Sequence, residues 1–68
     1  IKYAGRNVGL FIPDFVINDQ IIVEIKTIEK ITSNEQGQVL NYLRASSLKL
    51  GIILNFKHAK LEWKRLVL

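Results

Sequence analysis

Two short runs of branched apolar residues on either side of a helical segment constrain the fold of this chain more than any other feature. Residues 21–27 and 51–56 are rich in Ile, Val and Leu, the composition of buried strands. Between them, Thr32 and Glu35 have the spacing of a capping box, which predicts the start of a helix. Leu50-Gly51 predicts its end. The apolar residues between share one helical stripe: Val39, Leu40, Leu43 and Leu50. We therefore predict a parallel βαβ unit with a right-handed crossover.

Three further strands complete the expected sheet. They are predicted at residues 1–4, 8–12 and 60–68, with the turn-rich residues 5–7 between the first two. Residues 15–17 continue the second strand past Pro13, which lacks an N–H and so indicates an edge or a bulge. In the last strand, Trp63 is the expected large apolar anchor. The element order is β-β-β-α-β-β, an α/β fold with a mixed sheet and one helix packed on it.

The length of 68 residues allows one domain, which we place at residues 1–68. A chain this short has a thin core, and apolar residues at both of its ends favour a dimer or a higher homo-oligomer. The sequence contains no Met, and we therefore expect a processed chain or a fragment.

Composition excludes several kinds of site. Without Cys, the chain cannot build a disulfide scaffold, a thiolate zinc site or a cysteine nucleophile. The single His58 cannot form a histidine metal site alone. No apolar run is long enough to cross a membrane, and nothing resembles a signal peptide. We therefore expect a cytoplasmic protein with no membrane partner.

The charge of the chain is distributed unevenly. Residues 1–43 contain four basic and five acidic residues, whereas residues 44–68 contain six basic residues and one acidic residue, a net charge of +5. A basic half suits a polyanion such as nucleic acid, because Lys and Arg beside phosphates release counterions. The other interpretation is a solvated basic surface that aids solubility, and charge alone favours it.

Three charged residues interrupt the apolar strands. Asp14 lies in the second strand, and Glu24 and Lys26 share one face of the third, because they are two residues apart. A three-residue loop at 18–20 would pair Asp14 with Glu24 on that face, whereas a two-residue turn would separate them. The three-residue register also gathers five apolar residues on the other face: Phe15, Ile17, Ile21, Val23 and Ile25. This agreement between pattern and chemistry favours the shared face.

Two opposed carboxylates repel each other unless a cation lies between them. Asp14 and Glu24 offer the hard oxygen ligands that Mg²⁺ or Mn²⁺ prefers, and the backbone carbonyl of Ile25 can add another. Lys26 can stabilise negative charge, or position a water and help to deprotonate it. These are the parts needed to hydrolyse a phosphodiester. The structural alternative is a salt bridge between Lys26 and one of the carboxylates.

Pro13-Asp14, a short hairpin and Glu24-Ile25-Lys26 resemble the signature of the PD-(D/E)XK nuclease superfamily. The resemblance covers nearly the whole chain, with the motifs in the right order. It implies a restriction-endonuclease-like core and a metal-dependent nuclease that acts on nucleic acid, with DNA as the expected substrate. It also implies that Asp14 and Glu24 are metal ligands and that Lys26 is the catalytic lysine.

The helical segment adds Gln38-x-x-x-Tyr42, which is similar to the Gln-x-x-x-Tyr motif of the RecB-like branch of that superfamily. The two residues are four apart and therefore lie on one stripe of a helix. The resemblance implies that they contact the nucleic acid backbone or orient the groups of the active site. Without it, an exposed amide and a half-buried tyrosine would be the simpler interpretation.

Within the superfamily, the chain most resembles the GxxExxY subgroup, through residues 8–14, 21–26, 38–43, 51–56 and 61–65. That subgroup is named for a Gly-x-x-Glu-x-x-Tyr helix, whose Glu would place a further acid beside the metal. No such motif occurs in these 68 residues. The alternative function is therefore a catalytically incomplete module that binds nucleic acid or assembles with other chains and retains the nuclease core fold.

Overall fold

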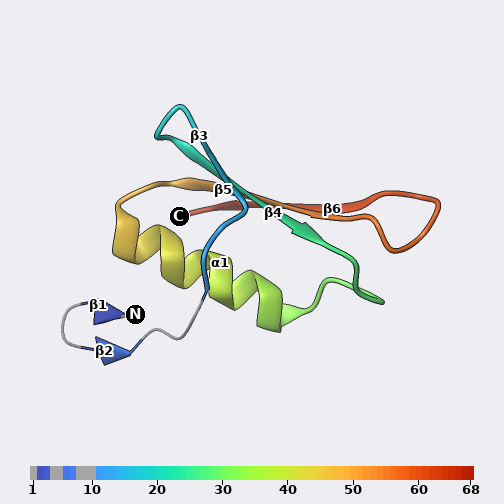
Figure 1. The fold of residues 1–68 in the computed structure, drawn as a ribbon, viewed down its shortest axis with the longest axis horizontal. Coiled ribbons are helices and arrows are strands. Elements are labelled where there is room, and N and C mark those ends of the chain that lie inside the picture. The colour runs from blue at the N-terminus through green and yellow to red at the C-terminus, as the bar shows by residue number, and fades with distance from the viewer. Residues whose placement is uncertain (1, 4–5, 8–10) are drawn as a thin grey trace.

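A mixed four-stranded sheet with one helix packed on it forms the main body of the protein. The computed structural model describes residues 2–3, 6–7 and 11–68. The sheet has the order β3-β4-β5-β6, in which β4 and β5 are parallel and the outer pairs are antiparallel. The strands are β3 (Phe15–Ile17), β4 (Ile21–Lys26), β5 (Leu50–Asn55) and β6 (Glu62–Val67), and the helix is α1 (Ser33–Ser46). The predicted α/β class and the parallel βαβ unit are confirmed (Figure 1).

The N-terminal strands differ from the prediction. Strands β1 (Lys2–Tyr3) and β2 (Arg6–Asn7) pair with each other in a separate two-stranded sheet, so that part of the expected turn at 5–7 is strand. Residues 8–10 of the strand expected at 8–12 lie outside the described residues, and Phe11 and Ile12 are not in a strand. Pairing with β4 begins only after Pro13, because proline has no N–H to donate to a ladder.

The predicted capping box opens helix α1. The Thr32 hydroxyl accepts a hydrogen bond from the Asn34 N–H at 3.2 Å, and the Glu35 carboxylate accepts one from the Thr32 N–H at 2.6 Å. The helix ends earlier than predicted, at Ser46, because Ser47 adopts a left-handed conformation with φ of 67°. Leu50 therefore lies in β5 and not on the helical stripe, and its partner in the sheet is Ile21.

The core lies between helix α1 and one face of the sheet. Ile22, Val39, Leu43 and Ile53 are fully buried there. A side chain at Gly51 would place its Cβ 2.7 Å from Val39 Cγ1. The absence of a side chain at this position therefore permits the close approach of the helix to β5.

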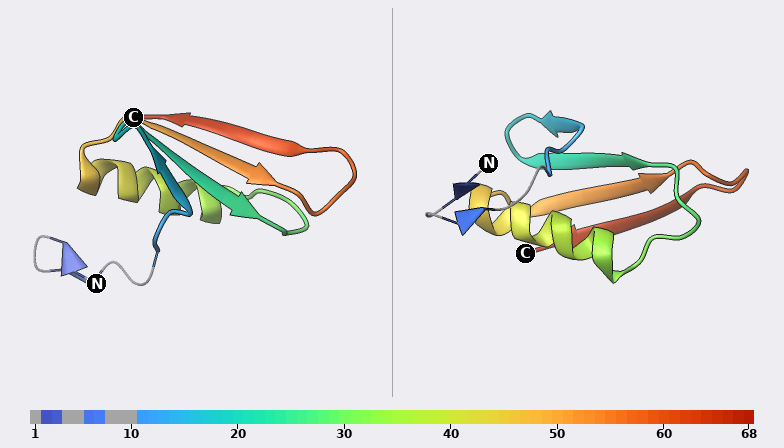
Figure 2. Two further views of the ribbon diagram at one scale, coloured as in Figure 1. Left: turned by 45° about the horizontal axis from the view of Figure 1, so that its top comes forward. Right: turned by 60° about the horizontal axis from the view of Figure 1, so that its bottom comes forward.

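The register divides the sheet into two faces. The face on the helix side, which we call the covered face, contains Val16, Ile22, Glu24, Lys26, Gly51, Ile53, Asn55, Glu62, Lys64 and Leu66. The open face contains Phe15, Ile17, Ile21, Val23, Ile25, Leu50, Ile52, Leu54, Trp63, Arg65 and Val67. Among the described elements, none packs over the open face, and Figure 2 shows the helix on the other side of the sheet.

Trp63 is not the anchor that its size suggested. It lies opposite Leu54 on the open face, and 61% of its surface is exposed. Leu66, on the covered face, is the buried residue of β6. The alternation of side chains along a strand decides this, because only one of the two faces meets the helix.

No helix in the described part of the chain is long and apolar enough to cross a membrane.

Candidate active site

Asp14 is placed by the short segment that leads into β3. The loop at 18–20 pairs Ile17 with Ile21, as the three-residue register predicted. The ladder between β3 and β4 starts at Phe15 and Val23. One Oδ atom of Asp14 accepts a hydrogen bond from the Ile25 N–H at 2.6 Å. This side-chain hydrogen bond therefore joins the segment to β4 beyond Phe15 and Val23, where the backbone pairing of the two strands ends.

Glu24 lies on the covered face, and only 6% of its surface is exposed. One carboxylate oxygen, Oε2, is 3.3 Å from the Lys26 Nζ. The other, Oε1, is buried and has no hydrogen-bond partner among the described residues. Burial raises the pKa of Glu24 above its usual value of 4.5, and the negative charge of Asp14 raises it further, whereas Lys26 lowers it.

Lys26 is the last residue of β4, and its side chain is largely buried beside Glu24. The salt bridge that the sequence allowed is therefore present. It occupies only one oxygen of Glu24, however, so that the buried Oε1 still lacks a partner. A buried carboxylate oxygen without a partner costs free energy, which a bound cation would offset.

The donor set at this site suits a hard divalent cation. It consists of the Glu24 Oε1 and the Asp14 carboxylate, to which the sequence analysis adds the backbone carbonyl of Ile25 as a third oxygen donor. Among the described residues, no three His, Cys, Asp or Glu side chains gather at one point. A metal held here by this chain would therefore complete its coordination with water or with substrate oxygens.

The structure does not link Gln38 or Tyr42 to these groups by any hydrogen bond among the described residues. Gln38 is exposed, and Tyr42 is half-buried. The Tyr42 ring meets the Phe11 ring edge-on, with 5.7 Å between their centroids. Phe11 belongs to the same segment as Asp14, so Tyr42 contacts the segment that carries the first carboxylate.

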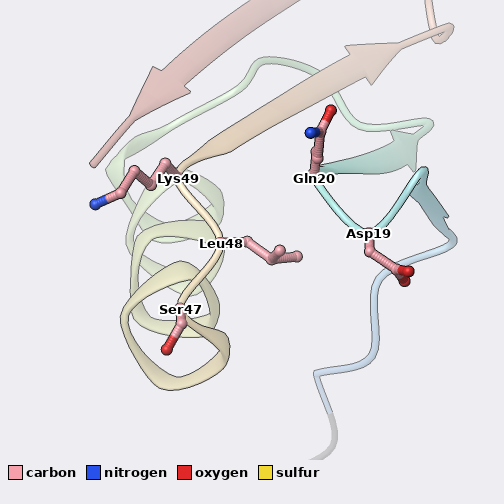
Figure 3. Close-up of a pocket in the computed structure, with 5 residues that line it drawn as sticks. All are labelled: Asp19, Gln20, Ser47, Leu48 and Lys49. Atoms are coloured by element: carbon pink, nitrogen blue, oxygen red, sulfur yellow. The ribbon is translucent and has the colours of Figure 1, made fainter.

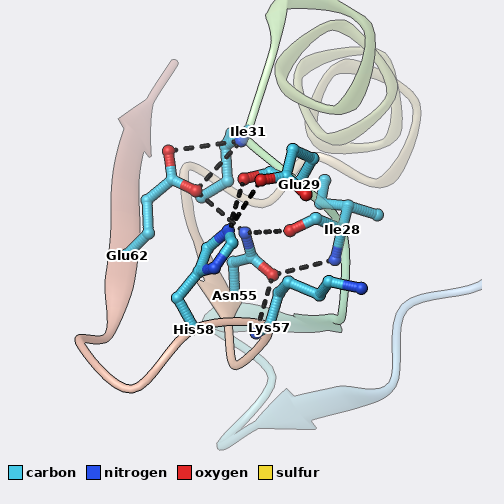
Figure 4. A network of polar contacts seen from close by, with 7 residues as sticks. All are labelled: Ile28, Glu29, Ile31, Asn55, Lys57, His58 and Glu62. Carbon is cyan, nitrogen blue, oxygen red and sulfur yellow. Dashed lines mark hydrogen bonds and ion pairs between the residues drawn. The ribbon is translucent and has the colours of Figure 1, made fainter.

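Asn55 is a polar residue of this region that the sequence analysis missed. It is the register partner of Lys26 and is 1% exposed. Its Nδ2 donates to the Ile28 carbonyl and to Glu62, both at 2.8 Å, and its Oδ1 accepts from the Ile28 N–H at 3.0 Å. Figure 4 shows this network. The one available signal was an amide in the otherwise apolar run 51–56.

Glu62 extends the network toward the helix. Its two carboxylate oxygens accept from the Ile31 N–H at 3.1 and 3.2 Å. His58 lies close by on the surface, with its Nε2 2.9 Å from the Glu29 carbonyl oxygen and 3.3 Å from the Glu29 carboxylate. These contacts hold residues 27–31, the connection between Lys26 and helix α1, against β5 and β6.

A shallow hollow of about 260 Å³ lies at the opposite end of the sheet. It is lined by the β3–β4 turn and by the residues between α1 and β5: Asp19, Gln20, Ser47, Leu48 and Lys49 (Figure 3). None of the three charged residues of the candidate site lines it. The hollow and the candidate site are therefore separate.

Comparison with known proteins identifies the family. The model of the PD-(D/E)XK nuclease superfamily matches residues 1–66, a range that includes Asp14, Glu24 and Lys26. Comparisons with curated proteins and with solved structures gave no significant match.

Proposed function

Because the chain belongs to the PD-(D/E)XK nuclease superfamily, we propose that it is a metal-dependent nuclease-type domain that hydrolyses phosphodiester bonds, with DNA as its substrate. The observation that carries this proposal is the buried, unpartnered Oε1 of Glu24 beside a lysine and a second carboxylate. Members of the superfamily depend on a divalent metal, and the oxygen donors of this site fit one.

In this proposal, Asp14, Glu24 and the Ile25 carbonyl hold Mg²⁺ or Mn²⁺. The metal supplies positive charge to the phosphate and lowers the pKa of a bound water. The Ile25 N–H orients the Asp14 carboxylate through the 2.6 Å hydrogen bond. Lys26 stabilises the negative charge that develops on the phosphate oxygens, and its position is fixed by Glu24.

Gln38 and Tyr42 have secondary roles in this proposal. Gln38 is exposed on the helix and contacts the nucleic acid backbone, whereas Tyr42 orients the segment that carries Asp14 through its contact with Phe11. Membership of the GxxExxY subgroup stays a prediction, as does the assignment of residues 1–68 to a single nuclease-like domain.

A second candidate function is a module that binds nucleic acid or assembles with other chains but does not cleave. One observation favours it: only two carboxylates meet at the site among the described residues, and no third acid joins them.

The two functions are separated by a cleavage assay with the full chain. Supercoiled plasmid and single-stranded DNA are incubated with the protein in Mg²⁺, Mn²⁺ or EDTA. We expect cleavage that requires metal and that falls at least about 100-fold in Lys26→Ala, because a charge-stabilising group is lost. Lys49→Ala, at the other end of the sheet, is the matched control and should cleave normally. DNA binding without cleavage would support the second function instead.

A further inference from the structure

The hairpin between β5 and β6 exposes aromatic and basic side chains together. We call the exposed aromatic and basic side chains of the hairpin loop and of the open-face side of β6 the hairpin surface: Phe56, Lys57, Lys60, Trp63 and Arg65. Phe56 is 54% exposed and Trp63 is 61% exposed. Large aromatic side chains usually bury most of their surface, so their exposure beside three cations indicates a binding surface.

The acidic groups near the hairpin surface already have partners. The Glu62 carboxylate accepts from Ile31 and Asn55, and Glu29 faces His58. In contrast, none of the three cations of the hairpin surface forms an ion pair within the part of the chain that the structure describes. The surface therefore presents positive charge that suits a polyanion.

The hairpin surface begins at the end of the sheet that carries the candidate active site. Asn55, the last residue of β5, is the register partner of Lys26, and the Phe56 N–H donates to the Lys26 carbonyl at 2.8 Å. In Figure 1 the hairpin extends beyond the end of β4. A nucleic acid strand held at Lys26, on the covered face, would reach Trp63 on the open face by passing around this end of the sheet.

We propose that the hairpin surface binds a single-stranded stretch of nucleic acid, with Trp63 stacked on a base and Lys57, Lys60 and Arg65 on phosphates. This inference rests on the proposed function and adds a substrate surface to it. Proteins that bind single strands without sequence preference combine a positively charged surface with exposed aromatic side chains, on which the bases stack. In a duplex the bases are stacked on one another, so their faces are not available to the indole ring of Trp63.

A second copy of the chain is the competing occupant of this surface. Trp63 lies in a row with Ile25 and Leu54 on the open face, and such a row can pack against an apolar partner. Arg65 shares that face, however, and residues 44–68 carry a net charge of +5. Two such surfaces would repel each other, whereas a nucleic acid would neutralise them.

Trp63 is the sole tryptophan, so its fluorescence reports on this surface alone. The full chain is titrated with a short oligothymidylate in EDTA, where no cleavage can occur. We expect quenching of the Trp63 emission and binding that weakens about 20-fold between 50 and 200 mM salt, the effect of roughly three phosphate contacts. If the oligonucleotide did not quench the Trp63 emission even at 50 mM salt, the proposal would be overturned.

Variants are compared by the anisotropy of a labelled oligonucleotide, with circular dichroism as the check that each is folded. Trp63→Ala should bind roughly 5- to 100-fold more weakly, because stacking on one base is lost. Arg65→Ala should lower the salt slope by about 0.7. Phe15→Ala and Lys49→Ala, an exposed aromatic and an exposed lysine away from the hairpin, should bind as the unmodified chain does.

Two further results would overturn the proposal. Equal binding by Trp63→Ala and the unmodified chain would exclude the stacking role, even if the metal-dependent cleavage assay succeeded. A shift of the Trp63 emission with protein concentration, in the absence of oligonucleotide, would assign the surface to a second copy. Binding in EDTA without any cleavage in metal would retain the hairpin surface and reject the nuclease activity.

Discussion

The two faces of the main sheet reverse the usual relation between polarity and burial. The covered face contains the core residues Ile22 and Ile53, and on the same two strands it buries Glu24 and Asn55. The open face is almost wholly apolar, yet it includes Ile25 at 37% exposure and Trp63 at 61%. A core built from apolar residues alone would avoid the free-energy cost of burying the Glu24 carboxylate. The comparison therefore links the buried charge to the candidate active site and not to the stability of the fold.

The buried polar groups also differ from one another. Asn55 is fully satisfied, since its amide bonds to Ile28 and Glu62. Glu24 is only partly satisfied, since its Oε1 lacks a partner among the described residues. A satisfied group stabilises its surroundings, whereas an unsatisfied one is typical of a site that a ligand completes.

The largest expected effect comes from truncating matched isoleucines on the two faces. Ile22→Ala should lower the free energy of unfolding by about 2–5 kcal/mol, because it leaves a cavity in the core. Ile25→Ala, on the open face, should cost about 1 kcal/mol or less. Urea denaturation measures both. Equal losses would break the comparison, because they would mean that the open face is covered in solution.

The next effect concerns the unsatisfied carboxylate. Mn²⁺ at 100 times its Kd should stabilise the folded chain by about 2.7 kcal/mol, because it binds only the folded form. Glu24→Gln should lose this rise in Tm, whereas the exposed Glu29→Gln should keep it. Thermal unfolding with and without Mn²⁺ tests the pair. A rise that persisted in Glu24→Gln would place the metal elsewhere.

Removal of the satisfied group should cost somewhat less. Asn55→Ala leaves the N–H and carbonyl of Ile28 without partners and should destabilise the fold by about 1–3 kcal/mol. Asn34→Ala, on the exposed side of the helix start, should change stability by no more than about 0.5 kcal/mol. Denaturant titration of the two variants measures the difference. A neutral Asn55→Ala would mean that the connection at 27–31 does not depend on this network.

The smallest expected effect depends on pH. It concerns Glu35 at the start of helix α1, which lies outside both faces of the sheet. Hydrogen bonds from Thr32 lower the pKa of Glu35 below 4.5. A lowered pKa means that the unfolded chain binds this proton more tightly, so the contribution of Glu35 to stability is complete above pH 4.5 and is lost on acidification. Tm measured from pH 7 to pH 3 should therefore fall less in Glu35→Gln. An unchanged fall would show that the capping box does not contribute.

Much of the fold could be predicted from local chemistry. The spacing of Thr32 and Glu35 located the helix start, and the loop at 18–20 set the register that aligns Asp14 with the Glu24 region of β4. In both cases the determining groups are close in sequence. The candidate residues Asp14, Glu24 and Lys26 are therefore brought together as the pattern indicated, although their catalytic roles stay a prediction.

Other features depend on contacts that the sequence does not encode locally. The run 21–25 has apolar residues on both faces, so it could not indicate which face the helix covers. The exposure of Trp63 follows from that choice, and not from its own hydrophobicity. The helix end was misplaced because the left-handed residue is Ser47, whereas glycine is the usual signal and the nearest was Gly51.

The hydrogen bond from the Ile25 amide to Asp14 has a consequence for dynamics. Its acceptor is a side chain, so it can open by a single rotation without separating two strands. Each such rotation leaves the Ile25 amide hydrogen able to exchange with solvent deuterium, while the neighbouring amides of β4 stay protected. The exchange rate of that one amide therefore reports how readily the Asp14 side chain releases it.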